Sequence, residues 1–243
     1  MLFRSNNAGV SVGSPLKITG TLTPTSGTLT TNGNLILASS SSGSAIVAQG
    51  SGTYLNGNVT VQRYIGSNQQ WRMMGFPLVK TTTINASDLS TQYGSGYNAY
   101  LYNEAADDGV NYGNSGTVNA GWVQFNGTGT ASASQGILML GGSPSTTLSA
   151  TGTLNTGNIS YTGKKTVQGW TFVANPYASN LDWTHFYNTT NSGFSSATTV
   201  SPSYYRYDPN STAYVSYNAV TATSSNSSLI SNIIPNGAAF FLR

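Results

Sequence analysis

The stretch NVTVQRYI, residues 58–65, alternates apolar and polar side chains with the two-residue period of a β-strand. Val59, Val61, Arg63 and Ile65 fall on one face of such a strand, because successive side chains point to opposite sides. The pattern therefore predicts a strand with one buried face and places a single cation within that face.

Short runs rich in Thr and aliphatic residues precede this strand, and Gly, Asn and Ser separate them. The runs are LKITGTLT, GTLTTNGNLILAS and GSAIVAQG, and Leu35 and Leu37 share a face in the second. Such strands with Gly corners are typical of β-solenoid rungs or of the edge of a sandwich. We expect residues 1–60 to form a β-solenoid-like or edge-strand lead-in, with SSSSGS at residues 39–44 as a loop.

Aromatic residues become dense after Ile65. About ten short strands with turn residues between them are typical of an antiparallel sandwich. We therefore expect an all-β protein, in which residues 61–243 form a jelly-roll-like antiparallel β-sandwich. Only NASDLSTQY and SNLDWTHFY interrupt the strand pattern.

The composition narrows the function classes. Charged residues make up 6% of the 243 positions, while 38% are hydrophobic and 11% aromatic, which differs from the pattern of disordered chains. The net charge of +3 comes without a basic stripe, so we expect no nucleic-acid partner. No apolar run approaches the roughly 20 residues of a membrane span. There is no Cys for disulfides or thiolate metal sites.

Several motifs resemble segments of a known group of proteins. GNVTVQRYIGSNQQWRMMGFPL, TGTLNTGNISYT, GWTFVANPYASNLDW and IIPNGAAFFLR occur here in that order. Together they resemble β-rich modules in large cell-surface and secreted bacterial proteins that use the type IX secretion system. The resemblance implies an extracellular or cell-surface location, with neighbouring modules or copies of itself as partners. The first residues lack the apolar stretch of a secretory signal, so an extracellular chain would be a mature or excised piece.

The stretch GWTFVANPYASNLDWTHFY, residues 169–187, is interpreted as a structural corner. Pro176 cannot donate to a β-ladder, so the strand should end near Asn175. Ser179 and Asp182 have the spacing of a capping box, which predicts a short helix over Leu181–Tyr187. The structural residues predicted here, with both Trp largely buried, are Trp170, Asn175, Pro176, Asp182 and Trp183.

A catalytic interpretation of this corner would use Asp182 to orient His185 as a base. It still needs a nucleophile, and the chain has one His, no Cys and no GxSxG motif. We therefore expect that the protein is not an enzyme.

The run NEAADDGVNYGN concentrates half of the six acidic residues in five positions: Glu104, Asp107 and Asp108. Carboxylates with nearby Asn oxygens are the ligands that Ca²⁺ prefers, although the EF-hand spacing is absent. These residues are candidate calcium ligands, and a solvated acidic loop is the alternative. We expect no other cofactor.

Arg63 and Arg72 lie in otherwise apolar strands. We expect them to be structural, with stems packed on aromatic rings and heads paired to backbone oxygens or to a carboxylate. Asp182 and Asp88 are the candidate partners. A clamp for a ligand carboxylate is the alternative.

The sequence thus favours a non-catalytic extracellular structural or adhesion module, which takes part in a filament or rod. Between Arg4 and Arg63 only Lys17 is charged, so few charged side chains oppose the pairing of further strands with the solenoid edges. The first alternative is a carbohydrate-binding module that uses exposed Tyr and Trp to stack on a surface glycan. The second is an accessory β-domain of a surface enzyme.

Overall fold

The computed structural model describes most of the chain as strands and turns. The described residues are 2–3, 9–48, 55–67, 70–78, 92, 98–107, 121–125, 131, 134–141, 144–159, 169–188 and 200–243. Helix α2 (Trp183–Asn188) and a single 3-10 turn, η2 (Glu104–Ala106), lie among them. The all-β class is therefore confirmed, and the sandwich or jelly-roll arrangement stays a prediction.

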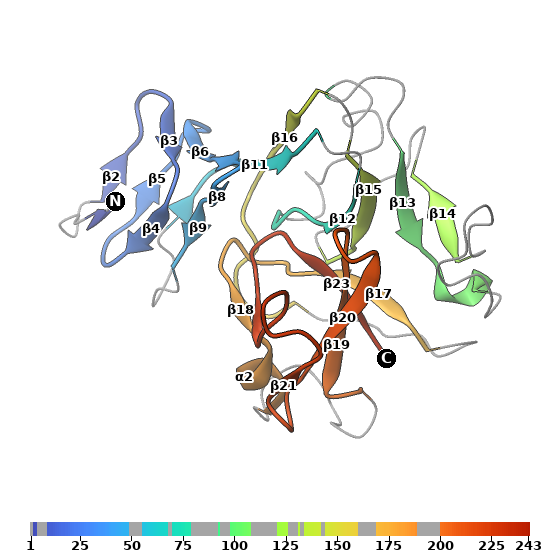
Figure 1. Cartoon of the computed structure of the whole chain (residues 1–243). Helices are drawn as coiled ribbons and strands as arrows, with labels where there is room; N and C mark the ends of the chain where they lie inside the picture. Colours follow the sequence, from blue (N-terminus) through green and yellow to red (C-terminus); the bar gives the residue numbers. More distant parts are fainter. Residues whose placement is uncertain are drawn as a thin grey trace.

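Parallel strand pairs in three sheets make up the N-terminal part, and each sheet takes one strand from each of three successive coils of chain. The first sheet holds β1 (Leu2–Phe3), β4 (Thr21–Pro24) and β9 (Ile46–Val47). The second holds β2 (Val10–Ser11), β5 (Leu29–Thr30) and β10 (Leu55–Asn56). The third holds β3 (Leu16–Ile18), β6 (Leu35–Leu37) and β11 (Val59–Ile65). The stacked coils form the blue end of the molecule in Figure 1 and have the register of a short β-solenoid.

The coils stack because the register places like residues above one another. Leu16, Leu35 and Val59 are aligned in one column of the third sheet. Leu35 and Val59 are fully buried, so the column forms part of the core. At the corners, uncharged polar side chains form hydrogen bonds with the backbone. For example, the hydroxyl of Thr31 donates to the carbonyl of Asn58 at 2.6 Å. The low charge content is thus compatible with satisfied corner groups.

Strand β11 joins the coils to the rest of the protein. Its first three residues pair in parallel with β6, and all seven pair antiparallel with β16 (Thr146–Gly152). Val59, Val61, Arg63 and Ile65 are all buried and alternate with less buried neighbours, as the two-residue period predicts. The strand runs across residues 60 and 61, so the expected boundary between residues 1–60 and 61–243 falls inside an element.

The serine-rich run was expected to be a loop and instead forms a hairpin of β7 (Ser39–Ser40) and β8 (Gly43–Ser44). Two tight strands are possible here because Gly43 adopts a positive φ of 137° at the turn. The Ser39 hydroxyl accepts a hydrogen bond from the Tyr64 N–H at 3.0 Å, which holds the hairpin against β11.

Two antiparallel sheets form the C-terminal part. One has the order β12 (Trp71–Met74), β15 (Ile137–Leu140), β13 (Ala99–Tyr102) and β14 (Trp122–Gln124). The other has the order β17 (Thr171–Ala174), β23 (Ala239–Leu242), β19 (Ser203–Asp208), β20 (Ala213–Asn218) and β21 (Thr223–Ser224). A separate pair joins β18 (Leu181–Asp182) to β22 (Ile233–Ile234).

Aromatic rings fill the space between the two larger antiparallel sheets. Phe241 lies at the centre, with its ring centroid 4.7 Å from Phe172, 5.0 Å from Tyr102 and 5.7 Å from Trp122. The edge-to-face geometry of most of these pairs is the favourable one for aromatic side chains. In Figure 1, β23 passes beside β12 at this junction.

Candidate functional site: an arginine-lined pocket

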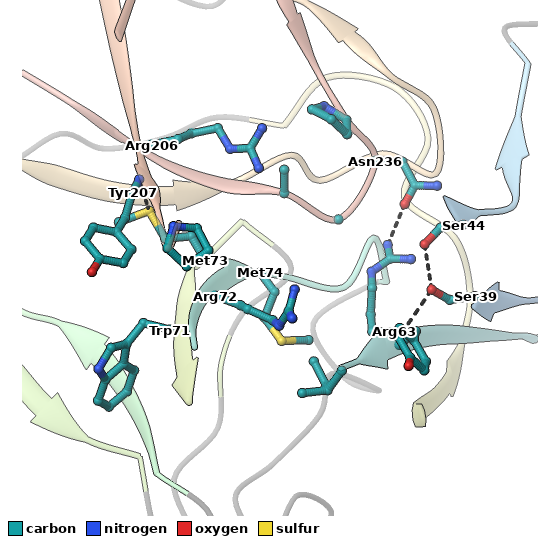
Figure 2. Close-up of a pocket in the computed structure, with 16 residues that line it drawn as sticks. Ser39, Ser44, Arg63, Trp71, Arg72, Met73, Met74, Arg206, Tyr207 and Asn236 are labelled. Carbon is teal, nitrogen blue, oxygen red and sulfur yellow. Dashed lines mark hydrogen bonds between the residues drawn. The ribbon is translucent and has the colours of Figure 1, made fainter. Parts of the chain in front are cut away.

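A pocket of about 260 Å³ opens where β11, β12, β19 and the β7–β8 hairpin meet the turn before β23. Three of the five arginines of the chain line it, namely Arg63 from β11, Arg72 from β12 and Arg206 from β19. Figure 2 shows their guanidinium groups around the same space. The lining residues, all within the described part of the chain, include no Asp or Glu. The described lining thus carries three cationic side chains and no acidic one.

Arg63 is 6% exposed and ties three segments together. Its Nε donates to the carbonyl of Gly75 at 3.1 Å, its Nη1 to that of Gln62 at 2.9 Å, and its Nη2 to Oδ1 of Asn236 at 2.6 Å. These bonds leave one N–H on Nη1 and one on Nη2, because a guanidinium group carries five. Burial lowers the pKa of Arg63 to about 10, so the group still carries its charge at neutral pH.

The turn that holds Arg63 needs a glycine. Gly237 has a φ of +67°, and a Cβ added there would lie 2.1 Å from Nε of Arg63. Asn236 is fixed as well, because its Nδ2 donates to the carbonyl of Ala45 at 2.6 Å. The head of Arg63 thus has a defined position in the pocket wall.

Arg206 comes from β19, on the other side of the pocket. Its Nε is buried, and no group in the described part of the chain accepts a hydrogen bond from it. Burial lowers the pKa of Arg206, while Tyr204 and Asp208 act in the opposite direction. The Asp208 carboxylate accepts hydrogen bonds from the backbone N–H of Ser211 at 2.8 Å and from its hydroxyl at 2.6 Å, and these bonds lower the pKa of Asp208. Asp208 is thus bonded to Ser211 and acts on Arg206 through its charge.

Two hydroxyl groups line the opposite wall. Ser39 and Ser44 lie with their oxygens 2.7 Å apart, and Ser39 also accepts from the Tyr64 N–H. One hydroxyl proton is used between the two serines, so the second is available to another acceptor. Figure 2 shows this pair beside Arg63.

The remaining lining residues are apolar or aromatic, and Figure 2 shows the rings of Trp71 and Tyr207 pointing away from the Arg72 and Arg206 heads. Trp71, Met73, Met74 and Tyr207 line the pocket together with Pro209 and Pro235. Trp71 is held by Tyr100, whose ring centroid lies 5.7 Å away. Chemically, the pocket offers cationic donors, a hydroxyl and an apolar wall, and its lining contains no carboxylate or imidazole for general acid–base chemistry.

Arg63 has backbone oxygens and an aromatic ring as partners, as expected, and Asp182 is not among its partners. The heads were expected on backbone oxygens or on a carboxylate, and Arg63 contacts two carbonyls and an amide, with its Cζ 5.8 Å from the ring centroid of Phe76. Asp182 lies at the start of α2, where its Oδ1 accepts from the His185 N–H at 3.1 Å. Asp88 lies outside the described residues.

The corner at residues 169–188 is packed much as expected. Trp183 is fully buried and donates from Nε1 to the carbonyl of Pro202 at 2.8 Å. Asn175 is also fully buried, and its amide donates to the carbonyl of Ser179 at 2.9 Å. Strand β17 ends at Ala174, just before Asn175 and Pro176.

Two details of the corner differ from the prediction. Helix α2 begins at Trp183, and Asp182 caps it in place of Ser179, because residues 181 and 182 pair with β22 as β18. Trp170 is only half-buried, with its ring centroid 5.2 Å from Tyr205 and 5.2 Å from Cζ of Arg243. His185 is exposed on α2 and does not line the pocket.

Two of the three candidate calcium ligands lie in described segments. Glu104 and Asp107 are buried, whereas a solvated loop would expose them. Oε1 of Glu104 accepts from the Gly169 N–H at 2.9 Å, and Asp107 accepts from the Tyr102 hydroxyl. Asp108 lies outside the described residues. Among the residues that are described, no group of three or more His, Cys, Asp or Glu side chains could hold a metal ion, and the calcium site stays a prediction.

Comparison with known proteins gives no relative: no protein-family model, no curated protein and no solved structure matches this chain. In the described residues, no helix has the length and apolar character needed to cross a membrane.

Arg206 and the two serines are the pocket residues that sequence reasoning missed. The segment SYYRYD carries the same signal as Arg63 and Arg72, a lone cation in a strand of apolar and aromatic residues. The serine pair gave no such signal, since SSSSGS has the composition of a linker.

Proposed function

We propose that the protein is a non-catalytic adhesion module of a bacterial cell-surface or secreted protein, and that the arginine pocket holds an anionic group of its ligand. The observation that carries this proposal is the presence of the Arg63 and Arg206 guanidinium groups in one pocket whose described lining includes no Asp or Glu. The extracellular location is supported by the sequence motifs that resemble type IX secretion cargo.

Cations that share a pocket repel one another, and an anion removes that repulsion. Folded proteins normally pair buried charges or leave them in water. Here Arg63 is buried and bonded only to neutral acceptors, and Nε of Arg206 has no acceptor in the described residues. The arrangement resembles a receptor for a negative group more than an internal ion pair, because guanidinium forks match carboxylate and phosphate geometry.

The scaffold favours binding over catalysis. Arg63, Arg72 and Arg206 lie on three strands that hydrogen-bonded partners hold in place, which limits their motion. A catalytic site would also need a group that moves a proton or attacks the substrate, and the polar side chains of the described lining are guanidinium groups, hydroxyls, the Asn236 amide and the Trp71 indole.

Binding to an anionic polymer tests this proposal. The full chain should bind polygalacturonate-coated beads at moderate salt and should not bind beads coated with neutral dextran. The double variant Arg72→Gln/Arg206→Gln should lose most of this binding. The matched control Lys17→Gln/Arg243→Gln removes the same charge from exposed positions outside the pocket and should retain it. Equal loss in both variants would show unspecific charge attraction and overturn the proposal.

The structural part of the role rests on the coils. In the described sheets β1, β2 and β3 are edge strands, and edge strands accept further strands. We propose that this edge pairs with a neighbouring module or with a second copy. Light scattering on the full chain should show a mass that rises with concentration, and Ser11→Lys on β2 should abolish the rise. A strict monomer at all concentrations would exclude pairing between copies.

A further inference from the structure

We infer that Asn56 is a self-modification site, at which the exposed corner Asn56–Gly57 converts spontaneously to aspartate and isoaspartate in the folded protein. The inference concerns the coils and is independent of the arginine pocket. It selects one site because the structure surrounds the Asn–Gly pairs of the chain differently. These pairs begin at Asn32, Asn56, Asn126 and Asn236, and Asn126 lies outside the described residues.

The reaction needs only the chain and water. The Gly57 backbone nitrogen loses its proton to hydroxide and bonds to Cγ of Asn56. The Cγ–Nδ2 bond then breaks, and the nitrogen leaves as ammonia after it takes a proton from water. A second water molecule opens the resulting succinimide ring at either carbonyl, which gives aspartate or isoaspartate. Glycine in the second position favours the attack because it has no side chain to hinder the approach.

The fold requires the glycine that makes this pair labile. Gly57 has a φ of +98°, in the left-handed region, and a Cβ added there would lie 2.7 Å from Oγ1 of Thr31. That hydroxyl is held in place, because it donates to the carbonyl of Asn58 at 2.6 Å. A larger residue, which would slow the reaction, therefore does not fit this corner.

Both reacting groups at the Asn56 corner are accessible. Asn56 and Gly57 are exposed, and among the described residues neither the Asn56 side chain nor the Gly57 N–H has a hydrogen-bond partner. Strand β10 ends at Asn56, lies at the edge of its described sheet and pairs with β5 over two residues. The backbone rotation that brings the nitrogen to Cγ thus disturbs few bonds, chiefly the one from the Thr31 N–H to the Asn56 carbonyl at 2.8 Å.

The pair at Asn32 is exposed as well, but its side chain is held. Nδ2 of Asn32 donates to Oγ of Ser11 at 2.8 Å and to the carbonyl of Val12 at 3.2 Å. The N–H of Gly33 donates to Oγ1 of Thr31 at 3.4 Å. These bonds must break before the ring can close, so the folded protein should slow the reaction at Asn32.

The pair at Asn236 is protected most strongly. Asn236 is 9% exposed, its Oδ1 accepts from Arg63 at 2.6 Å, and its Nδ2 donates to the carbonyl of Ala45 at 2.6 Å. Both ends of the amide are therefore bonded inside the protein. The expected order of rates is Asn56, then Asn32, then Asn236.

The product adds a negative charge to an edge strand. A charged side chain on such a strand opposes the pairing of a further strand, so the modification would close the β10 edge as the protein ages. Isoaspartate also adds a methylene group to the main chain and shifts the corner relative to Thr31. Strand β11 keeps its three pairs with β6 and its seven with β16, so the change should stay local.

Mass spectrometry of aged protein tests the inference. The full chain is kept at neutral pH in water enriched in the heavy oxygen isotope, and a parallel sample is kept unfolded in urea. Digestion and fragmentation give the rate at each asparagine. The unfolded rates should be similar, because glycine follows all three residues. Folding should leave the Asn56 rate nearly unchanged and slow the Asn236 rate at least about tenfold, since two hydrogen bonds must break first.

Two variants assign the product to its corner. Asn56→Gln should remove the modified form and keep the wild-type circular dichroism spectrum, because the side chain is exposed and glutamine would need a larger ring. Ser11→Ala removes one bond of Asn32, so it should raise the Asn32 rate and leave the Asn56 rate unchanged.

Three results would overturn the inference. The first is an Asn56 rate in the folded protein as low as that of Asn236. The second is an Asn56 rate below that of Asn32. The third is a labelled product at Asn56 without isoaspartate, because direct hydrolysis of the side-chain amide gives aspartate alone.

Discussion

The coils and the antiparallel sheets both form buried cores, but they use different side chains to do so. Residues 9–48 form their core from Leu, Ile and Val columns and carry one charge, Lys17. The antiparallel sheets instead meet through aromatic rings around Phe241 and hold two of the three pocket arginines, Arg72 and Arg206, while Arg63 lies on β11. A parallel coil repeats one environment, whereas antiparallel sheets bring together residues that are far apart in sequence, such as Arg63 and Asn236, 173 positions apart.

The difference explains where a binding site can form. Stacked coils align apolar residues in columns, as in the pairs Leu16–Leu35 and Leu35–Val59. The coils are joined to the antiparallel part of the chain where β11 leaves them and pairs with β16. The pocket lies beside this junction and combines the β7–β8 hairpin and Arg63 of β11 with Arg72 and Arg206 of the antiparallel sheets.

The largest expected loss of stability comes from replacing a fully buried side chain in each core with alanine. Trp183→Ala should lower the free energy of unfolding by about 3–5 kcal/mol, because it removes a fully buried ring and its bond to Pro202. Leu35→Ala, at the centre of the coils, should cost about 2–5 kcal/mol. Val220→Ala is the control, since Val220 is 66% exposed and should change stability by less than about 0.5 kcal/mol.

Urea unfolding followed by tryptophan fluorescence measures both effects and their coupling. All four Trp lie outside the coils, at positions 71, 122, 170 and 183. One core cluster runs from Leu35 through Ile65 to Phe125, so Leu35→Ala should move the fluorescence midpoint as well. A midpoint unchanged by Leu35→Ala, with a shifted circular dichroism transition, would mean that the regions unfold independently.

Two glycines with similar backbone angles give a smaller, matched comparison. Gly33 in the coils has a φ of +75° and open space around a Cβ, while Gly237 has a φ of +67° and meets Arg63. Gly33→Ala should cost about 1–2 kcal/mol from the left-handed backbone alone. Gly237→Ala should cost a further 1–3 kcal/mol, roughly, from the clash, and should also weaken anion binding. Equal costs in thermal unfolding would show that Arg63 moves aside freely.

Alkaline pH gives the smallest and most local effect. Burial raises the pKa of Tyr204 to about 12, and its hydroxyl donates to the Ser231 carbonyl at 2.6 Å. The folded state then holds this proton more tightly than the unfolded state, so the stability from Tyr204 is complete below about pH 10 and is lost between about pH 10 and 12. Burial lowers the pKa of Arg63 to about 10, and its contribution has the opposite sign over the same range.

Urea midpoints measured between pH 8 and pH 12 test this dependence. Tyr204→Phe should flatten the fall above pH 10. Leu35→Ala should lower the whole curve without changing its slope, because residues 9–48 contain neither Tyr nor Arg. A change of slope in Leu35→Ala would contradict the assignment of the pH effect to the antiparallel region.

The sequence by itself determined the features that depend on neighbouring residues. The alternation in residues 58–65 predicted the buried face of β11, Arg63 included, because side-chain direction in a strand follows from position alone. Pro176 and the aromatic residues after it predicted the end of β17 and the packed Trp183, since a proline cannot donate to the ladder. Glycine corners and Thr-rich runs likewise predicted stacked short strands.

Only the tertiary structure decided which of these residues meet. Asp182 caps α2 and does not pair with Arg63, because residues 181 and 182 are drawn into a pair with β22. Arg63 binds Asn236, and Arg206 joins Arg63 and Arg72, because β11, β12 and β19 converge with the turn before β23. Strand order and register are set by burial summed over whole sheets, so no local pattern in the sequence contains them.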